Sequence, residues 1–215
     1  MVQYGQSITR NDRYWGQQMT FAAQPIGEFL DDVASGQVTP SGGAVAAVGG
    51  AMGAALCEMV CIHTVGTDGS GVESGELSAL ADALADNREQ LLAFADEDAA
   101  AVDAIGTAFE SGDDARIQEA SKRSTEVPLE TAEVCLDVVE HARTVTAKGT
   151  PVAVPDATVG VLLTAAALQA SVSTVRANLD MIDDESFVAV LKQRANEAEA
   201  AGEAALDEAV ANAKR

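Results

Sequence analysis

Apolar and polar residues recur with a helical period along most of the chain. Between residues 76 and 110, apolar residues follow three-four spacing and form one continuous stripe, made of Leu77, Leu80, Leu84, Leu91, Phe94, Val102, Ile105 and Phe109. No segment alternates apolar and polar residues between turns, as a half-buried strand would. The pattern predicts an all-α bundle of five to six helices, in a single domain over residues 23–215.

The other helices are predicted from their caps and breakers, over residues 25–35, 44–65, 113–146, 157–179 and 183–211. Asp156 and Asp183 are the expected N-caps of the last two. Pro128 removes a backbone hydrogen bond, so we expect it to bend or split its helix near Thr125. The Gly- and Ser-rich segment 66–75 is expected to be a loop.

Two of these helices are almost free of charge. Residues 44–65 carry only Glu58, which we expect at an interface or in an ion pair between helices, and residues 157–175 carry none. Both runs approach the ~20 residues that span a bilayer. They consist mostly of small residues and lack aromatic belts, which favours central helices of a bundle over membrane spans. Small-residue helices supply little bulk, so we expect an apolar surface that a second subunit covers, in a homodimer or a larger oligomer.

The charge of the chain excludes some classes of partner and indicates the salt conditions in which the protein works. The chain has 13 basic and 34 acidic residues, for a net charge of −21, which repels nucleic acid and anionic membranes. So acidic and lysine-poor a composition predicts a halophilic protein. Residues 1–22 show no helical or strand period and form a predicted N-terminal extension. Because the first 20 residues lack an apolar core, we expect no secretory signal and a cytoplasmic protein.

The three cysteines are expected to be free, buried thiols. Cys57 and Cys61 are four apart on a predicted helix, a spacing that suits metal ligands. His63, however, lies about 160° away from Cys61 around that helix, so the three side chains do not converge. We therefore predict no metal site.

Asp98 stands out on the predicted helix over residues 76–110. At about 100° per residue it falls in the middle of the apolar stripe, where a carboxylate is desolvated unless it is paired. It could be structural, as a cap or as the partner of a buried Arg143 or Arg176. It could equally be a general acid/base that faces a cleft. Asn87 lies in the same stripe and could line that cleft or bridge two helices.

The turn Pro40-Ser41-Gly42-Gly43 is the second candidate site, because it opens the uncharged helix over residues 44–65. Free N–H groups at a helix start, with glycines that let a ligand approach, suit a carboxylate, a phosphate or a carbonyl oxygen. Ser41 could also act simply as the N-cap of the helix.

Four ordered blocks resemble the formimidoyltetrahydrofolate cyclodeaminase / methenyltetrahydrofolate cyclohydrolase family, over about residues 26 to 187. The blocks are IGEFLDDVASGQVTPSGGAVAAVGGAMGAALCEMV, ADEDAAAVDAI, EVPLETAEVC and PDATVGVLLTAAALQASVSTVRANLDMIDDESF. The sequence departs from the family pattern at Ser41, where the family has glycine, and at Thr174, where it has asparagine. It also lacks a lysine in TAFESGDDAR.

The resemblance implies a helical homodimer that binds tetrahydrofolate derivatives near the dimer interface, with no cofactor beyond that substrate. By matching position, it implies that Asp98 is the proton-transferring residue. Lys148, Arg143 or Arg176 would meet the glutamate tail. The resemblance implies that the turn Pro40, Ser41, Gly42 and Gly43 holds the substrate. Together with Asn87 from the apolar stripe, Lys148 and Asp156, these are the predicted substrate contacts.

Three functional hypotheses follow. The first is a methenyltetrahydrofolate cyclohydrolase, in which water adds to the N5–N10 methenyl bridge and gives 10-formyltetrahydrofolate. The second is a formimidoyltetrahydrofolate cyclodeaminase, in which N10 closes on the formimino carbon and ammonia leaves. The chain has no room for the formiminotransferase domain of fused members, which favours the hydrolase. The third is a non-catalytic helical dimer that binds folate or a protein, which the departures from the family pattern favour.

Overall fold

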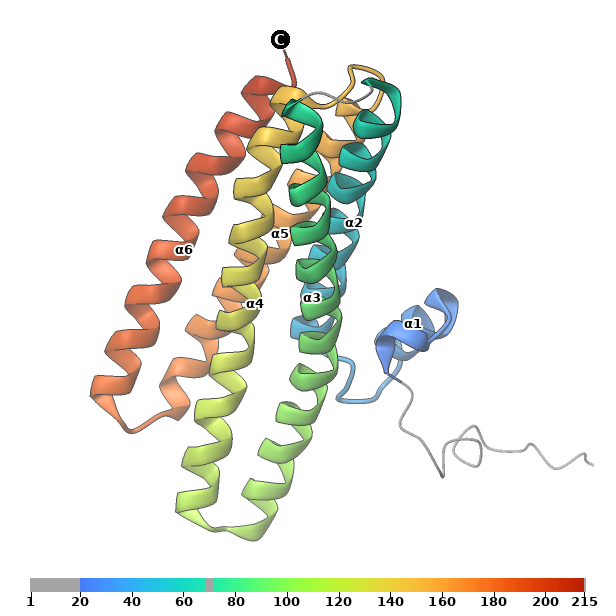
Figure 1. Cartoon of the computed structure of the whole chain (residues 1–215). Coiled ribbons are helices and arrows are strands. Elements are labelled where there is room, and N and C mark those ends of the chain that lie inside the picture. The colour runs from blue at the N-terminus through green and yellow to red at the C-terminus, as the bar shows by residue number, and fades with distance from the viewer. Residues whose placement is uncertain (1–19, 69–71, 215) are drawn as a thin grey trace, which may run out of the picture.

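The computed structural model describes residues 20–68 and 72–214. In that part of the chain there are six α-helices, two 3-10 helices and no strand (Figure 1), which confirms the predicted all-α class. The α-helices are α1 (Ile26–Val33), α2 (Gly42–Asp68), α3 (Val72–Ser111), α4 (Asp114–Lys148), α5 (Val154–Asn178) and α6 (Glu185–Asn212); the 3-10 helices are η2 (Phe21–Ala23) and η3 (Leu179–Met181).

Helices α2 to α5 form a four-helix bundle. α2 packs against α3 and α5, while α4 packs against the same two helices from the other side. α6 lies along α4 and α5, and α1 stands beside the bundle near the start of α2 (Figure 1). The predicted extension over residues 1–22 lies outside the described residues except for its last three.

α2 and α5 are the two nearly uncharged helices, and they pack directly against each other. By length and composition both could cross a membrane, and half of each apolar span is buried inside the bundle. Glu58, the charged residue predicted within α2, accepts from Arg88 of α3 at 2.9 Å. The predicted ion pair between helices is therefore confirmed.

Glycines bring the backbones of α2 and α5 into direct contact. A Cβ added at Gly53 would lie 2.1 Å from Thr164 Oγ1 and 2.5 Å from the carbonyl oxygen of Gly160. In turn, a Cβ at Gly160 would lie 2.8 Å from the carbonyl oxygen of Gly53. Real Cβ atoms do not approach so closely, so this crossing explains why glycine is used despite its poor helix propensity.

Pro128 does not split its helix, because α4 runs unbroken from Asp114 to Lys148. Proline has no N–H to donate to the carbonyl four residues earlier, which belongs to Ser124. Asn178, the last residue of α5, donates from Nδ2 to that carbonyl at 2.9 Å. A side chain of the neighbouring helix thus replaces the missing backbone donor and lets α4 continue.

The predicted loop over residues 66–75 was wrong for most of its length. α2 continues to Asp68 and α3 begins at Val72, while residues 69–71 lie outside the described part. Local Gly and Ser preferences are weak, and the packing of α2 against α3 overrides them.

Two predicted caps were also wrong. Asp156 lies inside the first turn of α5, whose N-cap is Ala153 with no side-chain hydrogen bond. Pro155 occupies that first turn, where its fixed φ suits a helix start, so the helix begins earlier. α6 is capped by Asp184, whose carboxylate accepts from the N–H of Phe187 at 3.1 Å, rather than by Asp183.

Candidate active site

Asp98 lies on the face of α3 that packs against the beginning of α2. Only 6% of its surface is exposed, which confirms the burial predicted from its place in the apolar stripe. Phe94, one turn earlier on the same face, is also buried. A carboxylate in such surroundings needs hydrogen-bond donors, because burial without them costs several kcal/mol.

The start of α2 supplies the donors for Asp98. Oδ2 accepts a hydrogen bond of 2.6 Å from Ser41 Oγ and one of 2.9 Å from the backbone N–H of Ala44. A carboxylate at a helix N-terminus is also favoured by the helix dipole. Asp98 therefore caps α2 from another helix, as one structural alternative predicted.

The alternative partners proposed for Asp98 are engaged elsewhere. Arg143 pairs with Glu208 of α6. Arg176 forms hydrogen bonds of 2.9 and 2.6 Å with Glu199, also on α6. The prediction that a buried arginine pairs with Asp98 was therefore wrong, because backbone and hydroxyl donors at the start of α2 already satisfy the carboxylate.

Of the two glycines in the turn, Gly43 is the one that leaves room for the side chain of Asp98. A Cβ at this position would lie 2.0 Å from Asp98 Oδ1 and 2.5 Å from its carboxyl carbon. Gly42, by contrast, has no atom within 4 Å of an added Cβ and is exposed. Pro40 and Ser41 are half-buried beside them, after a cis Thr39–Pro40 peptide bond. The predicted turn and the predicted carboxylate thus form one cluster.

The structure does not bring Lys148 and Asp156 to this cluster. The backbone N–H of Thr150 donates to Thr64 Oγ1, near the far end of α2. At 1.5 Å per residue, Thr64 is roughly 33 Å along the helix from Gly42. Lys148 itself donates to Glu76 at 2.6 Å. Both residues therefore belong to the opposite end of the bundle.

Asn87 is also separate from Asp98. The two residues are eleven positions apart on α3, or roughly 16 Å along its axis. Asn87 is half-buried, and its Oδ1 is buried without a hydrogen-bond partner among the described residues. Its amide therefore faces another part of the bundle, not the start of α2.

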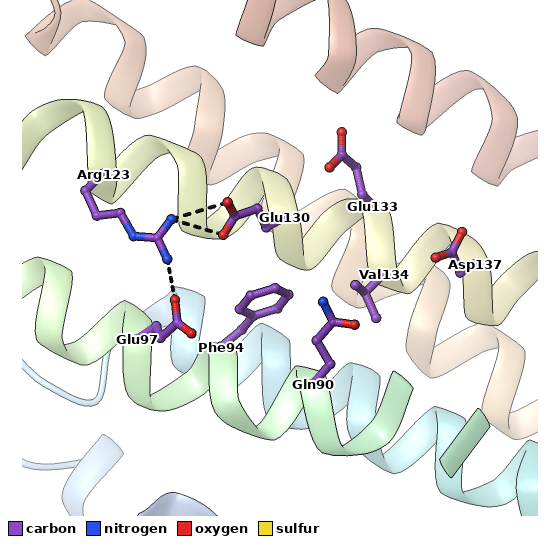
Figure 2. A pocket seen from close by; sticks show the side chains of 8 residues that line it. All are labelled: Gln90, Phe94, Glu97, Arg123, Glu130, Glu133, Val134 and Asp137. Carbon is purple, nitrogen blue, oxygen red and sulfur yellow. Dashed lines mark hydrogen bonds and ion pairs between the residues drawn. The ribbon is translucent and has the colours of Figure 1, made fainter. Parts of the chain in front are cut away.

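A groove of about 540 Å³ lies between α3 and α4, and Asp98 is not among the residues that line it. Figure 2 shows the ring of Phe94 between the two helices, with acidic side chains around it. The pKa of Asp137, one of these, is raised, first by burial and then by the nearby Glu140 and Glu133, while His141 opposes the rise. Four carboxylates and one arginine line this groove, so it does not suit an anionic ligand.

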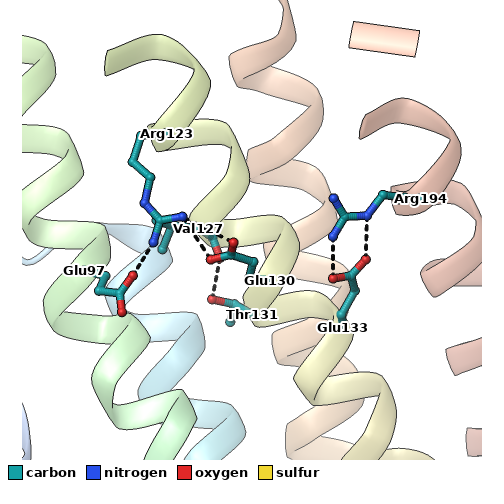
Figure 3. A network of polar contacts seen from close by, with 7 residues as sticks. All are labelled: Glu97, Arg123, Val127, Glu130, Thr131, Glu133 and Arg194. Carbon is teal, nitrogen blue, oxygen red and sulfur yellow. Dashed lines mark hydrogen bonds and ion pairs between the residues drawn. The ribbon is translucent and has the colours of Figure 1, made fainter. Parts of the chain in front are cut away.

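Most of the charged side chains around this groove form ion pairs. Arg123 donates to Glu130 at 3.1 Å and also pairs with Glu97 (Figure 3). Arg194 of α6 binds both carboxylate oxygens of Glu133, at 2.9 and 2.7 Å. These pairs tie α3, α4 and α6 together, and we assign them a structural role.

The three cysteines are buried and free. Burial raises the pKa of Cys57 to about 12 and that of Cys135 to about 12. The pKa of Cys61 is raised to about 11, by burial and by the nearby carboxylate of Glu58. The thiols are therefore protonated at neutral pH and poor nucleophiles.

Comparison with known proteins agrees with this architecture. A family model described as Formiminotransferase-cyclodeaminase matches residues 25–197. The chain belongs to this family. A methenyltetrahydrofolate cyclohydrolase of Methylorubrum extorquens, strain AM1, is 35% identical over 173 residues, which cover 76% of this chain and 83% of that protein.

A member of the family with a solved structure has the same fold. The crystal structure of formiminotetrahydrofolate cyclodeaminase from Thermotoga maritima superposes with a TM-score of 0.86 at 28% identity. The match covers 90% of this chain and 97% of that one. The resemblance predicted from the four sequence blocks is therefore confirmed, and the relatives are enzymes.

Sequence reasoning missed one feature of the site and one of the fold. It did not find the backbone N–H of Ala44 as a donor to Asp98, since no sequence pattern shows which residue meets a helix start from 54 positions away. It also missed the hydrogen bond that Asn178 donates to the carbonyl of Ser124. A signal for the second existed, because a proline inside a helix always leaves the carbonyl four residues earlier without its donor.

Proposed function

We propose that the protein is a methenyltetrahydrofolate cyclohydrolase that uses Asp98 to transfer the proton. The observation that carries this proposal is the 35% identity, over most of the chain, with a protein of that name. The buried carboxylate at the start of α2 supports it, because the reaction needs one group that takes up and returns a proton.

In this mechanism a water oxygen forms a bond to the methenyl carbon between N5 and N10. Asp98 takes a proton from that oxygen, and the carbon becomes tetrahedral. The C–N5 bond then breaks while N5 receives a proton, which leaves the formyl group on N10. One proton of the water ends on N5 and the other is released. The negative charge of Asp98 also stabilises the cationic methenyl bridge as it approaches.

The structural likeness favours a second candidate, the cyclodeaminase. There N10 attacks the carbon of the protonated formimino group on N5, and ammonia leaves from the tetrahedral carbon, which gives the methenyl cation. The same carboxylate would move the proton from N10 to the departing nitrogen. Because both reactions pass through a carbon bonded to two folate nitrogens, one site can serve either. A non-catalytic binding protein is not favoured, since the named relatives are enzymes.

The test measures both reactions in molar KCl, with wild type and Asp98→Asn. Loss of methenyltetrahydrofolate absorbance reports the hydrolase, and release of ammonia from the formimino compound reports the deaminase. We expect hydrolysis by the wild type and a loss of at least about 100-fold in Asp98→Asn, as for a positioned acid/base. Activity of Asp98→Asn equal to wild type would refute the role of Asp98 in either reaction. We expect activity to survive dialysis against a chelator, since no cofactor beyond the folate is proposed.

We also propose that the protein is a homodimer, joined through the outer faces of α2 and α5. Large apolar side chains on these faces are 38–53% exposed, namely Val45, Met52, Val159, Leu162 and Leu163. The two helices are neighbours in the bundle, so these side chains extend one apolar surface. Leu162→Glu should shift the mass measured by light scattering from dimer to monomer. Phe109→Glu, which alters an equally exposed side chain at the end of α3, should leave the mass unchanged.

The acidic composition supports a halophilic, cytoplasmic protein that binds neither nucleic acid nor membrane. The acidic side chains that give the net charge of −21 repel one another at low ionic strength, and salt screens that repulsion. We expect the Tm to rise steadily with KCl up to molar concentrations. A Tm that is independent of salt from dilute buffer upwards would contradict this.

A further inference from the structure

Ser41 contacts the proposed catalytic carboxylate directly. Its hydroxyl donates to Asp98 Oδ2 at 2.6 Å, and the N–H of Ala44 donates to the same oxygen at 2.9 Å. A serine hydroxyl has a single proton, so once it is given to Asp98 it has none to give to a ligand. While this hydrogen bond is present, Ser41 can contact a ligand only as an acceptor.

The two oxygens of Asp98 differ in their surroundings. Among the described residues, both hydrogen bonds to the carboxylate reach Oδ2 and none reaches Oδ1. Oδ1 lies over Gly43, where an added Cβ would be 2.0 Å away. It is nevertheless not one of the fully buried polar atoms that lack a partner. Asp98 is 6% exposed as a residue, and Oδ1 contributes to that exposed area.

We propose that Ser41 is a positioning residue that fixes Oδ2, so that Oδ1 is the atom that exchanges the proton with the substrate. This inference rests on the proposed function, since it concerns how Asp98 acts in that reaction. An oxygen that already accepts two hydrogen bonds is the weaker base of the pair. Oδ1, which accepts no hydrogen bond, is the oxygen that can exchange a proton with water or N10. The hydrogen bonds to Oδ2 keep Oδ1 in a fixed orientation.

The hydrogen bond from Ser41 sets the rotation of the carboxylate. With Ser41 present, two donors hold Oδ2, and the backbone at Gly43 limits the space around Oδ1. Without the hydroxyl, only the Ala44 N–H remains, and one hydrogen bond permits rotation about the Cβ–Cγ bond. The reacting oxygen would then spend less time in the productive orientation.

The experiment compares Ser41→Ala and Ser41→Thr with the wild type in the hydrolase and deaminase assays. Ser41→Ala should lower kcat by about 10- to 100-fold, the value of a hydrogen bond to a charged group, and change KM by less than about twofold. Ser41→Thr keeps the hydroxyl and should restore most of kcat. Ser186→Ala is the matched control, because Ser186 donates to the carboxylate of Asp184 at 2.7 Å on the exposed start of α6. It should leave kcat unchanged.

A double-mutant comparison separates positioning from a merely structural role. In an Asp98→Asn background, Ser41→Ala should cause little further loss of activity, because the group that it positions is already inactive. If Ser41→Ala does not fold, Ser41→Cys, a weak donor of similar size, provides the same comparison.

Three outcomes would overturn the proposal, and they are distinguishable. Wild-type kcat in Ser41→Ala would show that the hydroxyl is not needed. A raised KM at unchanged kcat would show that Ser41 binds the substrate. Additive losses with Asp98→Asn would show that the two residues act independently. An inactive wild type in both assays would refute the proposed function itself, and the role of Ser41 with it.

Discussion

The contact between Asn178 and the proline-containing stretch of α4 gives a sharp prediction about stability. Ser124 is 5% exposed, and its carbonyl receives no helical donor from Pro128, so Asn178 Nδ2 supplies one at 2.9 Å. Asn178→Ala leaves that buried carbonyl unsatisfied, which costs about 1–3 kcal/mol. For a chain of this size we expect the Tm to fall by about 2 to 4 °C for each kcal/mol.

The same reasoning predicts a rescue. Pro128→Ala restores an N–H at position 128, which can donate to the Ser124 carbonyl within the helix. In that background Asn178→Ala should cost less than about half as much, which is a coupling of about 1 kcal/mol. Denaturation in molar KCl, followed by circular dichroism for the four proteins, measures this coupling. The absolute effect of Pro128→Ala does not enter the comparison.

Asn212 provides the matched control for this cycle. Its Nδ2 donates to the carbonyl of Arg143 at 3.1 Å, also on α4, but position 147 is an alanine and keeps its own N–H. Asn212→Ala should therefore cost the same with and without Pro128→Ala. If Asn178→Ala also costs the same in both backgrounds, the explanation for the uninterrupted helix is refuted.

Three further predictions follow from close contacts and charge. Gly43→Ala should reduce kcat at least as much as Ser41→Ala, because its Cβ would displace Asp98; wild-type turnover would contradict the site geometry. Gly53→Ala should lower the Tm by several degrees, since overpacking against the α5 backbone costs about 1–3 kcal/mol. Gly106→Ala, with open space, should instead raise it by about 2 °C, and equal shifts would refute this contrast. Asp137→Asn should raise the Tm at neutral pH, because the folded state holds the ionised carboxylate poorly. That gain should vanish as pH falls through the raised pKa toward the ordinary value of 3.8, and a gain independent of pH would contradict it.

The sequence predicted what depends on local periodicity. The stripe on α3 keeps helical spacing for about nine turns, so both the helix and the burial of Asp98 followed from it. The ends of the helices could not be predicted in the same way. Packing of α2 against α3 overrides the local preference of the Gly- and Ser-rich segment 66–75, and Pro155 makes α5 begin before the expected cap Asp156.

Only part of the site could be predicted, because its residues are far apart in the sequence. Asp98 and Ser41 are 57 positions apart, and their contact depends on the register in which α3 packs on α2. Lys148 and Asp156 were predicted as substrate contacts from their positions along the chain, Asp156 from a family block and Lys148 as a cation for the glutamate tail. Such positions carry no information on which end of a helix they reach, and here both residues lie near the far end of α2.

The three buried thiols can report how often the helices of the bundle separate. With pKa values of about 11 to 12, about one thiol in 10⁴ or fewer is ionised at neutral pH, and all three side chains are covered by packed helices. Cys57 and Cys61 lie on α2 and Cys135 lies on α4, so a thiol reagent can react at an appreciable rate only when one of these helices separates from its neighbours. The rate of alkylation in a series of KCl concentrations would show whether salt acts on that separation, without any label being introduced into the chain.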